Sequence, residues 1–185
     1  TQRKNQSASN YFNSLKVVPV SISYEYDPCI IEKARELYAA SQGIDYVKAE
    51  FEDLDSIQKG FLGYKGRVQV NFGDCIDHKF ETAEDLATEV DRQIYGLYQL
   101  FPTNIIAWKM QANSNQQSFD QLKQLSPDEN WSQAETDFEA HLQSVPPEHR
   151  SLVIDAYAAP VKNQLDYQQQ SPVLGDSINE EAIVC

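Results

Sequence analysis

Two short stretches in the first part of the chain have the apolar pattern of β-strands. Residues 17–24 (VVPVSISY) are rich in β-branched side chains and are bounded by polar segments. Residues 67–72 (RVQVNF) alternate between polar and apolar positions, which predicts a strand with one face buried. About 40 residues of mainly helical sequence separate the two stretches. This spacing favours a parallel βαβ crossover.

Helical periodicity fills the connection between these strands. Asp27 and Pro28 suit the N-cap and first position of a helix that runs to about Ser41, and Gly43 is a natural end for it. A second, shorter helix is predicted over residues 53–59, ended by Gly60.

After residue 73 the pattern is helical throughout. Thr82 begins a helix that Pro102 ends, with apolar residues recurring at helical spacing. Residues 111–118 are a polar linker. The sequence Ser126–Glu129 reads as a capping box that opens another helix, which the Pro146–Pro147 pair ends. A further helix contains residues 152–157.

The predicted fold class is therefore α/β: a partial sheet with crossover helices, followed by an acidic helical extension. We expect an α/β unit over residues 1–76, a helical extension over residues 77–167 and a disordered tail over residues 168–185. The polar residues 1–14 suggest that the chain is a fragment of a longer protein. Half a sheet should leave apolar surface exposed, so the sequence also predicts poor solubility or self-association.

Charge is distributed unevenly along the chain. Residues 1–72 hold nine basic and nine acidic residues, so the whole net charge of −13 lies in residues 73–185, which hold six and 19. An acidic surface of this kind repels nucleic acid and anionic lipid, and no nucleic-acid partner is expected. No apolar run reaches the roughly 18–20 residues that span a bilayer.

Few side chains in the sequence suit catalysis or metal binding. The three cysteines are widely spaced, which indicates no disulfide framework and a reducing cytoplasm. Cys75, Asp77 and His78 lie close together, but further ligands at metal-binding spacing are lacking, so no metal and no cofactor is expected. His78, His141 and His149 are best explained as structural or surface residues, because none has a suitably spaced acidic partner.

A glycine-rich turn precedes the second strand. Gly60, Gly63 and Gly66 are followed by a strand and not by the helix that a nucleotide-binding loop requires, so a turn is the simpler interpretation. Lys65 and Arg67 beside these glycines could contact a phosphate-bearing substrate. A mixed-charge surface is the competing interpretation, because acidic residues are interspersed among the basic ones.

The segments VVPVSISYEYDPC, KARELY and YVKAEFEDLDSIQKGFLGYKGRVQVNFGDCI together resemble the second half of bacterial glycerolipid acyltransferases, which act on glycerol 3-phosphate or 1-acyl-glycerol 3-phosphate. The resemblance covers residues 15–110 and extends to DRQIYGLYQLFPTNIIAWKM. It implies that Val18, Pro19, Val20 and Ser21 match the family's fourth motif, which shapes the acyl and acceptor site.

The family's catalytic His-x4-Asp motif does not occur here, since none of the three histidines has Asp five positions later. No catalytic residue is therefore expected in this chain, which alone should be inactive. The resemblance implies a parent enzyme of phospholipid biosynthesis that uses acyl-CoA or acyl carrier protein and a lysophospholipid acceptor. It also implies that the parent lies on the cytoplasmic side of the inner membrane, with membrane contact through upstream sequence. The alternative is a non-catalytic acidic binding or regulatory domain.

Overall fold

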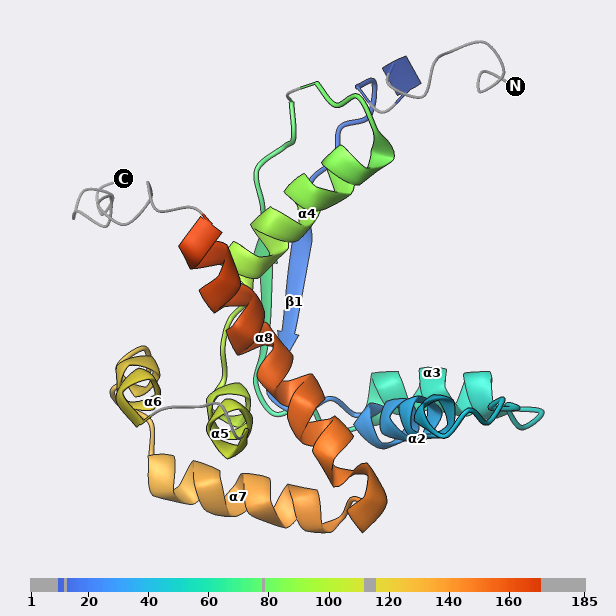
Figure 1. Ribbon diagram of the computed structural model, residues 1–185, viewed down its shortest axis with the longest axis vertical. Coiled ribbons are helices and arrows are strands. Elements are labelled where there is room, and N and C mark those ends of the chain that lie inside the picture. The colour runs from blue at the N-terminus through green and yellow to red at the C-terminus, as the bar shows by residue number, and fades with distance from the viewer. Residues whose placement is uncertain (1–9, 12, 78, 112–115, 171–185) are drawn as a thin grey trace.

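The protein has a mixed α/β fold that is mostly helical, with one small sheet (Figure 1). The computed structural model describes residues 10–11, 13–77, 79–111 and 116–170. Its elements in chain order are β1 (Val20–Tyr24), α2 (Ile30–Ser41), α3 (Glu52–Leu62), β2 (Val68–Phe72), α4 (Ala83–Leu97), α5 (Pro102–Met110), α6 (Gln116–Lys123), α7 (Trp131–Gln143), the 3-10 turn η2 (Pro147–His149) and α8 (Arg150–Gln170).

The two predicted strands form, and they pair with each other in antiparallel orientation. Val20 lies opposite Phe72 and Ile22 opposite Val70. The predicted parallel crossover is therefore wrong. Its physical cause lies in the connection: α2 packs on α8 and α3 projects from the molecule, and the chain then turns back at Gly66, whose φ is +61°.

Strand β1 buries its polar side chains, and both strands expose their apolar ones. Ser21 and Ser23 are 1% and 0% exposed, whereas Val20 and Ile22 between them are 39% and 48% exposed. The expectation that β2 buries its apolar positions is also wrong, because Val70 is 44% exposed. Alternation in the sequence located the strands correctly, but it did not identify which face the helices cover.

Hydrogen bonds to the segment after α4 explain why the polar side faces inward. The Gln99 backbone N–H donates to the Ser23 hydroxyl at 2.9 Å, and the Asn71 amide donates to the Leu97 carbonyl at 2.6 Å. These bonds satisfy polar groups that burial would otherwise leave unpaired. The sheet is thereby fixed to the α4–α5 connection through its polar side chains.

The core is built around α5, which packs against α7 and α8. The first six residues of α5 are all buried, as expected of a helix enclosed on every side. One core cluster joins Ile30 and Ala34 of α2 to residues of α5, α7 and α8. The described core thus spans the expected boundary at residue 76. Packing of this kind makes α2 part of the same body as the helices that follow.

Several helix ends differ from the sequence-based prediction. Thr82 caps α4 through a hydrogen bond with the Asp85 backbone N–H, as predicted. Pro102 instead occupies the first turn of α5, and α4 ends earlier at Leu97. The predicted capping box at Ser126–Glu129 is wrong, because α7 begins at Trp131 with Asn130 as its cap.

The later chain boundaries fall close to the prediction. Pro147 begins η2 after α7, so the proline pair separates two helices as expected. The last helix, α8, continues to Gln170, slightly beyond the predicted start of the tail. Residues 171–185 of that tail lie outside the described residues.

Replacing Asn104 with Ala should destabilise the core. Asn104 is 1% exposed; its Oδ1 accepts from the Phe101 backbone N–H at 2.8 Å and its Nδ2 donates to the Tyr157 carbonyl at 3.0 Å. Its loss leaves buried backbone groups unpaired, which costs about 2–4 kcal/mol of unfolding free energy. Urea denaturation measures the loss. Thr136→Ala on the exposed surface of α7 is the control and should change stability by less than about 0.5 kcal/mol.

Candidate functional site

The four residues of the predicted site lie at the start of β1, but their side chains divide between two faces. Val18 and Val20 are 45% and 39% exposed, whereas Pro19 and Ser21 are buried. The four side chains therefore do not converge on one cavity. The Ser21 hydroxyl is buried and has no hydrogen-bond partner among the described residues, which distinguishes it from Ser23.

Pro19 lies where the two strands begin to pair. Its carbonyl accepts a hydrogen bond from the Gly73 N–H at 2.8 Å. In an antiparallel ladder the N–H and C=O of such a residue point toward the same partner. The N–H that Pro19 lacks would therefore point toward β2, so the proline removes one bond from inside the ladder and not from an open edge.

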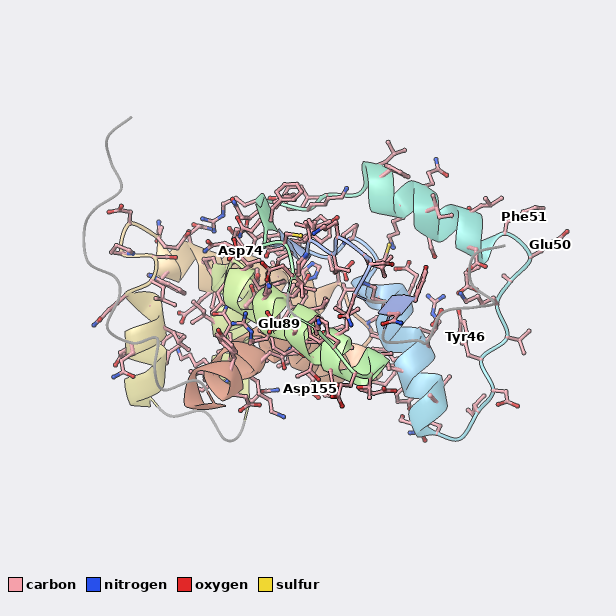
Figure 2. All side chains as sticks on the ribbon, turned by 90° about the horizontal axis from the view of Figure 1, so that it is seen from above. Tyr46, Glu50, Phe51, Asp74, Glu89 and Asp155 are labelled. Atoms are coloured by element: carbon pink, nitrogen blue, oxygen red, sulfur yellow. The ribbon has the colours of Figure 1, made fainter. Side chains whose placement is uncertain are left out.

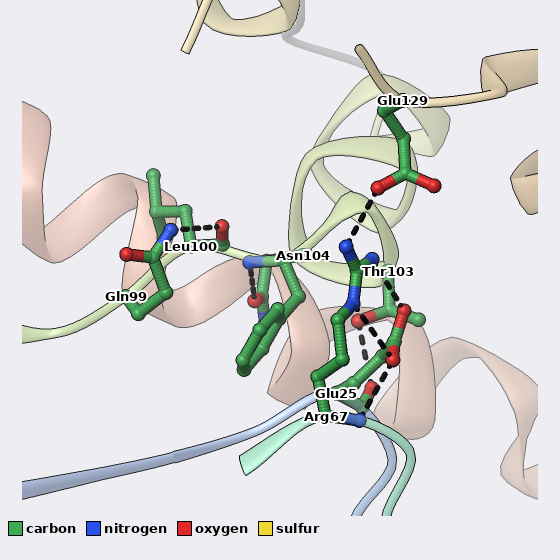
Figure 3. Close-up of polar contacts among 8 residues, drawn as sticks. Glu25, Arg67, Gln99, Leu100, Thr103, Asn104 and Glu129 are labelled. Atoms are coloured by element: carbon green, nitrogen blue, oxygen red, sulfur yellow. Dashed lines mark hydrogen bonds and ion pairs between the residues drawn. The ribbon is translucent and has the colours of Figure 1, made fainter. Parts of the chain in front are cut away.

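Arg67, the second predicted contact, is held by two carboxylates (Figure 3). Its Nε and Nη2 donate to the two oxygens of Glu25 at 3.1 and 2.7 Å, and its backbone N–H donates to Glu25 at 2.9 Å. Its Nη1 donates to Glu129 at 2.8 Å, and its guanidinium lies over the Phe101 ring. Arg67 thus joins the sheet to the segment before α7 and to the start of α5.

The Arg67 guanidinium also determines how Glu25 titrates. Burial alone would raise the pKa of Glu25, but side-chain and backbone hydrogen bonds from Arg67 hold that pKa below its ordinary value of 4.5. The same bonds raise the pKa of Arg67. Glu25 is therefore a firmly ionised partner, and it occupies the guanidinium face that a substrate phosphate would need.

Lys65 does not converge with Arg67 on a common point. Its ammonium donates to the carbonyls of Phe61 and Gly63, both at 3.0 Å. Lys48 and Lys59 pair with Asp53 and Glu32. The ion pairs of Lys48, Lys59 and Arg67 are what a mixed-charge surface predicts. A cavity of about 540 Å³ does lie beside Arg67, and Gln69, Gln99 and Ser126 contribute to its lining.

The two described histidines do not form a catalytic base with a carboxylate. The His141 Nε2 lies 3.4 Å from the Tyr157 hydroxyl, and burial lowers the pKa of His141. His149 is 7% exposed and packs against the Tyr38 ring. Neither makes a hydrogen bond or ion pair with a carboxylate within the part of the chain that the structure describes. His78 lies outside the described residues.

The described cysteines and acidic residues form no metal centre. The thiol of Cys29 donates to the Ser56 carbonyl at 3.5 Å, and Cys75 is exposed and free. Within the described ranges, no three side chains of His, Cys, Asp or Glu are placed to hold a metal ion. Nor does any helix of the described ranges have the length and apolar character needed to cross a bilayer.

A second cavity, of about 270 Å³, lies between α2, α5 and α8. Tyr157 contributes to its wall, and the Tyr157 hydroxyl accepts the Asp27 backbone N–H at 2.9 Å. Burial raises the pKa of Tyr157, so this phenol stays protonated. Sequence analysis did not single out Tyr157, Asn104 or Glu25. Of these three residues, only Glu25 could have been suspected from the sequence, because it is an acidic residue directly after the first predicted strand.

Comparison with known proteins adds no relative: no family model, curated protein or solved structure matches this chain. The geometry therefore has to be interpreted by itself. The strand pair bears the predicted site residues, and Arg67 beside it is ion-paired with Glu25 and Glu129. The described residues contain no histidine–carboxylate pair.

Replacing Arg67 with Ala should weaken attachment of the sheet to the helices. The change removes both ion pairs and leaves the Glu25 carboxylate, which is 15% exposed, without its main partner. We expect a loss of about 1–3 kcal/mol in unfolding free energy, measured by urea denaturation. Lys48→Ala is the control, since Lys48 pairs with Asp53 at 2.8 Å, both side chains are at least half exposed, and loss of this exposed pair should leave stability almost unchanged.

The contribution of Glu25 should depend on pH in a defined direction. Because its folded-state pKa is lowered, ionised Glu25 stabilises the fold above its ordinary pKa of 4.5, and this stabilisation is lost as pH falls through the folded-state pKa. Glu25→Gln should therefore be less stable than the parent chain at pH 7, with the gap narrowing below about pH 4.5. Thermal melts from pH 7 to pH 3 measure it; a gap that stays constant contradicts the assignment.

Proposed function

We propose that this chain is part of a glycerolipid acyltransferase. The reaction transfers a fatty acyl group from acyl-CoA or acyl carrier protein to a hydroxyl of glycerol phosphate or lysophosphatidate. The observation that supports it best is the pairing of the two segments that bear the resemblance. Residues 17–24 and 66–76 are far apart in the sequence, yet they lie side by side, joined by the Gly73–Pro19 hydrogen bond and by a bridge between Val17 and Ile76.

A bulge between these contacts gives the start of β1 a distinct shape. Val20 pairs with Phe72, so continuing the register would place Val17 opposite Cys75, but Val17 pairs with Ile76 instead. One extra residue is therefore accommodated on the second strand beside Val18 and Pro19. Bulges often redirect side chains next to functional sites. In this proposal Val18, Pro19, Val20 and Ser21 shape one wall of the acyl and acceptor site.

The proposal assigns the catalytic base to sequence outside these 185 residues. Acyl transfer to a hydroxyl requires a base that removes the hydroxyl proton. His141 and His149 lack a carboxylate partner within the described residues, and no His-x4-Asp motif occurs in the sequence. This chain then contributes substrate contacts and the parent protein contributes the proton transfer. The parent's place at the cytoplasmic side of the inner membrane belongs to the same proposal.

Purified alone, the chain should not convert lysophosphatidate and acyl-CoA to phosphatidate. Thin-layer chromatography with a radiolabelled acyl donor measures the product. The physical reason is the missing base, and the matched positive control is the longer parent enzyme. Turnover by the 185-residue chain above the rate without protein would contradict the assignment of the catalytic base to sequence outside this chain.

The Ser21 hydroxyl offers a sharper test of the site. Because it is buried without a described partner, Ser21→Ala should leave the stability of the chain unchanged or raise it by up to about 1 kcal/mol. In the parent enzyme the same change should lower kcat/KM. Ser23→Ala is the matched control: it removes the bond from Gln99 and should reduce stability by about 1 kcal/mol.

The acidic excess in residues 73–185 favours a second candidate, a non-catalytic binding or regulatory domain. The two candidates predict different effects of Ser21→Ala and Pro19→Ala on acyl transfer and on partner binding by the parent protein. Unchanged acyl transfer, accompanied by loss of a protein partner, would support the binding domain and exclude the acyl-site assignment.

A further inference from the structure

The outer face of the strand pair is apolar and uncovered. Val20 lies opposite Phe72 and Ile22 opposite Val70, so the apolar side chains of the two strands meet in cross-strand pairs on one face. These four side chains are 39%, 71%, 48% and 44% exposed. Two-stranded sheets are unstable without a layer against their apolar face. Here the helices support the sheet through its polar face, which leaves the apolar face free to contact a partner.

A second exposed apolar surface lies on α3. Helix α3 has no buried residue, and Leu54, Ile57 and Phe61 recur on it at helical spacing with exposures of 62%, 56% and 80%. Figure 1 shows that α3 lies beside α2, off the end of the strand pair, and Figure 2 shows the same two helices from above. Its exposed apolar side chains therefore form a second apolar surface, separate from the strand face, and exposed apolar patches mark interaction surfaces.

The charge distribution selects the kind of partner. All of the net charge of −13 lies in residues 73–185, and two copies that met through those helices would repel each other. Both strands and α3 belong to residues 1–72, in which basic and acidic residues balance. The apolar face is thus the side on which a second copy can approach without net repulsion.

The side chains of the face also suit contact with themselves. The cross-strand pairs consist of aliphatic and aromatic residues, so a twofold arrangement would bury no ionised group of the strands. A specific interface needs about 800 Å² per partner. The strand face supplies the centre of such an interface, because Val20, Ile22, Val70 and Phe72 are all exposed on it.

We propose that two copies of this chain associate through the apolar faces of their β1–β2 strand pairs, forming a two-layer sandwich of sheets. The polar faces stay on the α4–α5 connections, and the acidic helices lie on the outside of the dimer, away from each other. This proposal concerns the 185-residue chain by itself and does not rest on the proposed acyltransferase function. The dimer would bury Val20, which that function assigns to the acyl site of the parent enzyme.

Sedimentation equilibrium of the purified chain at micromolar concentrations tests the association. We expect a species of twice the 21.1 kDa monomer mass. Added salt should tighten the dimer, because it screens repulsion between the acidic helices and leaves apolar contact intact. A chain that stays monomeric over this range, or a dimer that salt dissociates, would overturn the proposal.

Two neighbouring positions on β2 provide matched variants. Val70→Lys places a charge on the apolar face and should weaken dimerisation at least about 10-fold, since two buried charges would meet. Gln69→Lys adds the same charge to the same strand on the opposite face and should leave the dimer unchanged. Circular dichroism and thermal melts of both variants establish that each is folded.

The remaining outcomes also decide the proposal. Equal dissociation constants for the two variants would place the contact elsewhere and contradict it. A wild-type monomer that binds dodecyl maltoside micelles through this face would identify lipid as the occupant, which also contradicts it. Acyl transfer is not measured in any of these experiments, so a failed dimer and a failed acyltransferase assignment remain distinguishable.

Discussion

Burial of α5 is the constraint on which the rest of the structure depends. Its first two turns are enclosed by α7 and α8, and the amide of Asn104 ties it to the Tyr157 carbonyl inside this core. The start of α5 then determines where the sheet lies. The Thr103 hydroxyl donates to the Glu25 carbonyl at 2.8 Å (Figure 3). The Arg67 guanidinium lies over the Phe101 ring, 5.4 Å from its centroid. The sheet is consequently held at the end of β1 and the beginning of β2.

That attachment explains the unusual exposure of the strands. Two hydrogen bonds join the sheet to the α4–α5 connection: the Asn71 amide donates to the Leu97 carbonyl, and the Gln99 backbone N–H donates to the Ser23 hydroxyl. The polar side of the sheet must therefore face the helices. With a period of two along each strand, every neighbouring apolar side chain then points away from them. Exposure of Val20, Ile22 and Val70 is thus a direct consequence of where the hydrogen bonds form, and it requires no local strain.

The sequence predicted local structure well and long-range arrangement poorly. Both strands and the Thr82 cap follow from short patterns of residues and were found at the expected places. Strand orientation depends on how residues 25–66 pack, and no pattern within that segment encodes the packing of α2 on α8. The clasp of Arg67 by Glu25 and Glu129 could not be predicted either, because 42 and 62 residues separate these partners from the arginine.

The predicted site residues show the same limit in functional terms. The sequence placed Val18–Ser21 together, but strand geometry sends Pro19 and Ser21 inward while Val18 and Val20 face outward. A wall with two such faces can contact an acyl group on one side only. The inward side then holds Pro19, next to the bulge, and the unpaired Ser21 hydroxyl two residues further along β1. In the proposed enzyme, the segment that brings the base must therefore approach the start of β1, since elsewhere on the strand the inward side is already bonded to the helices.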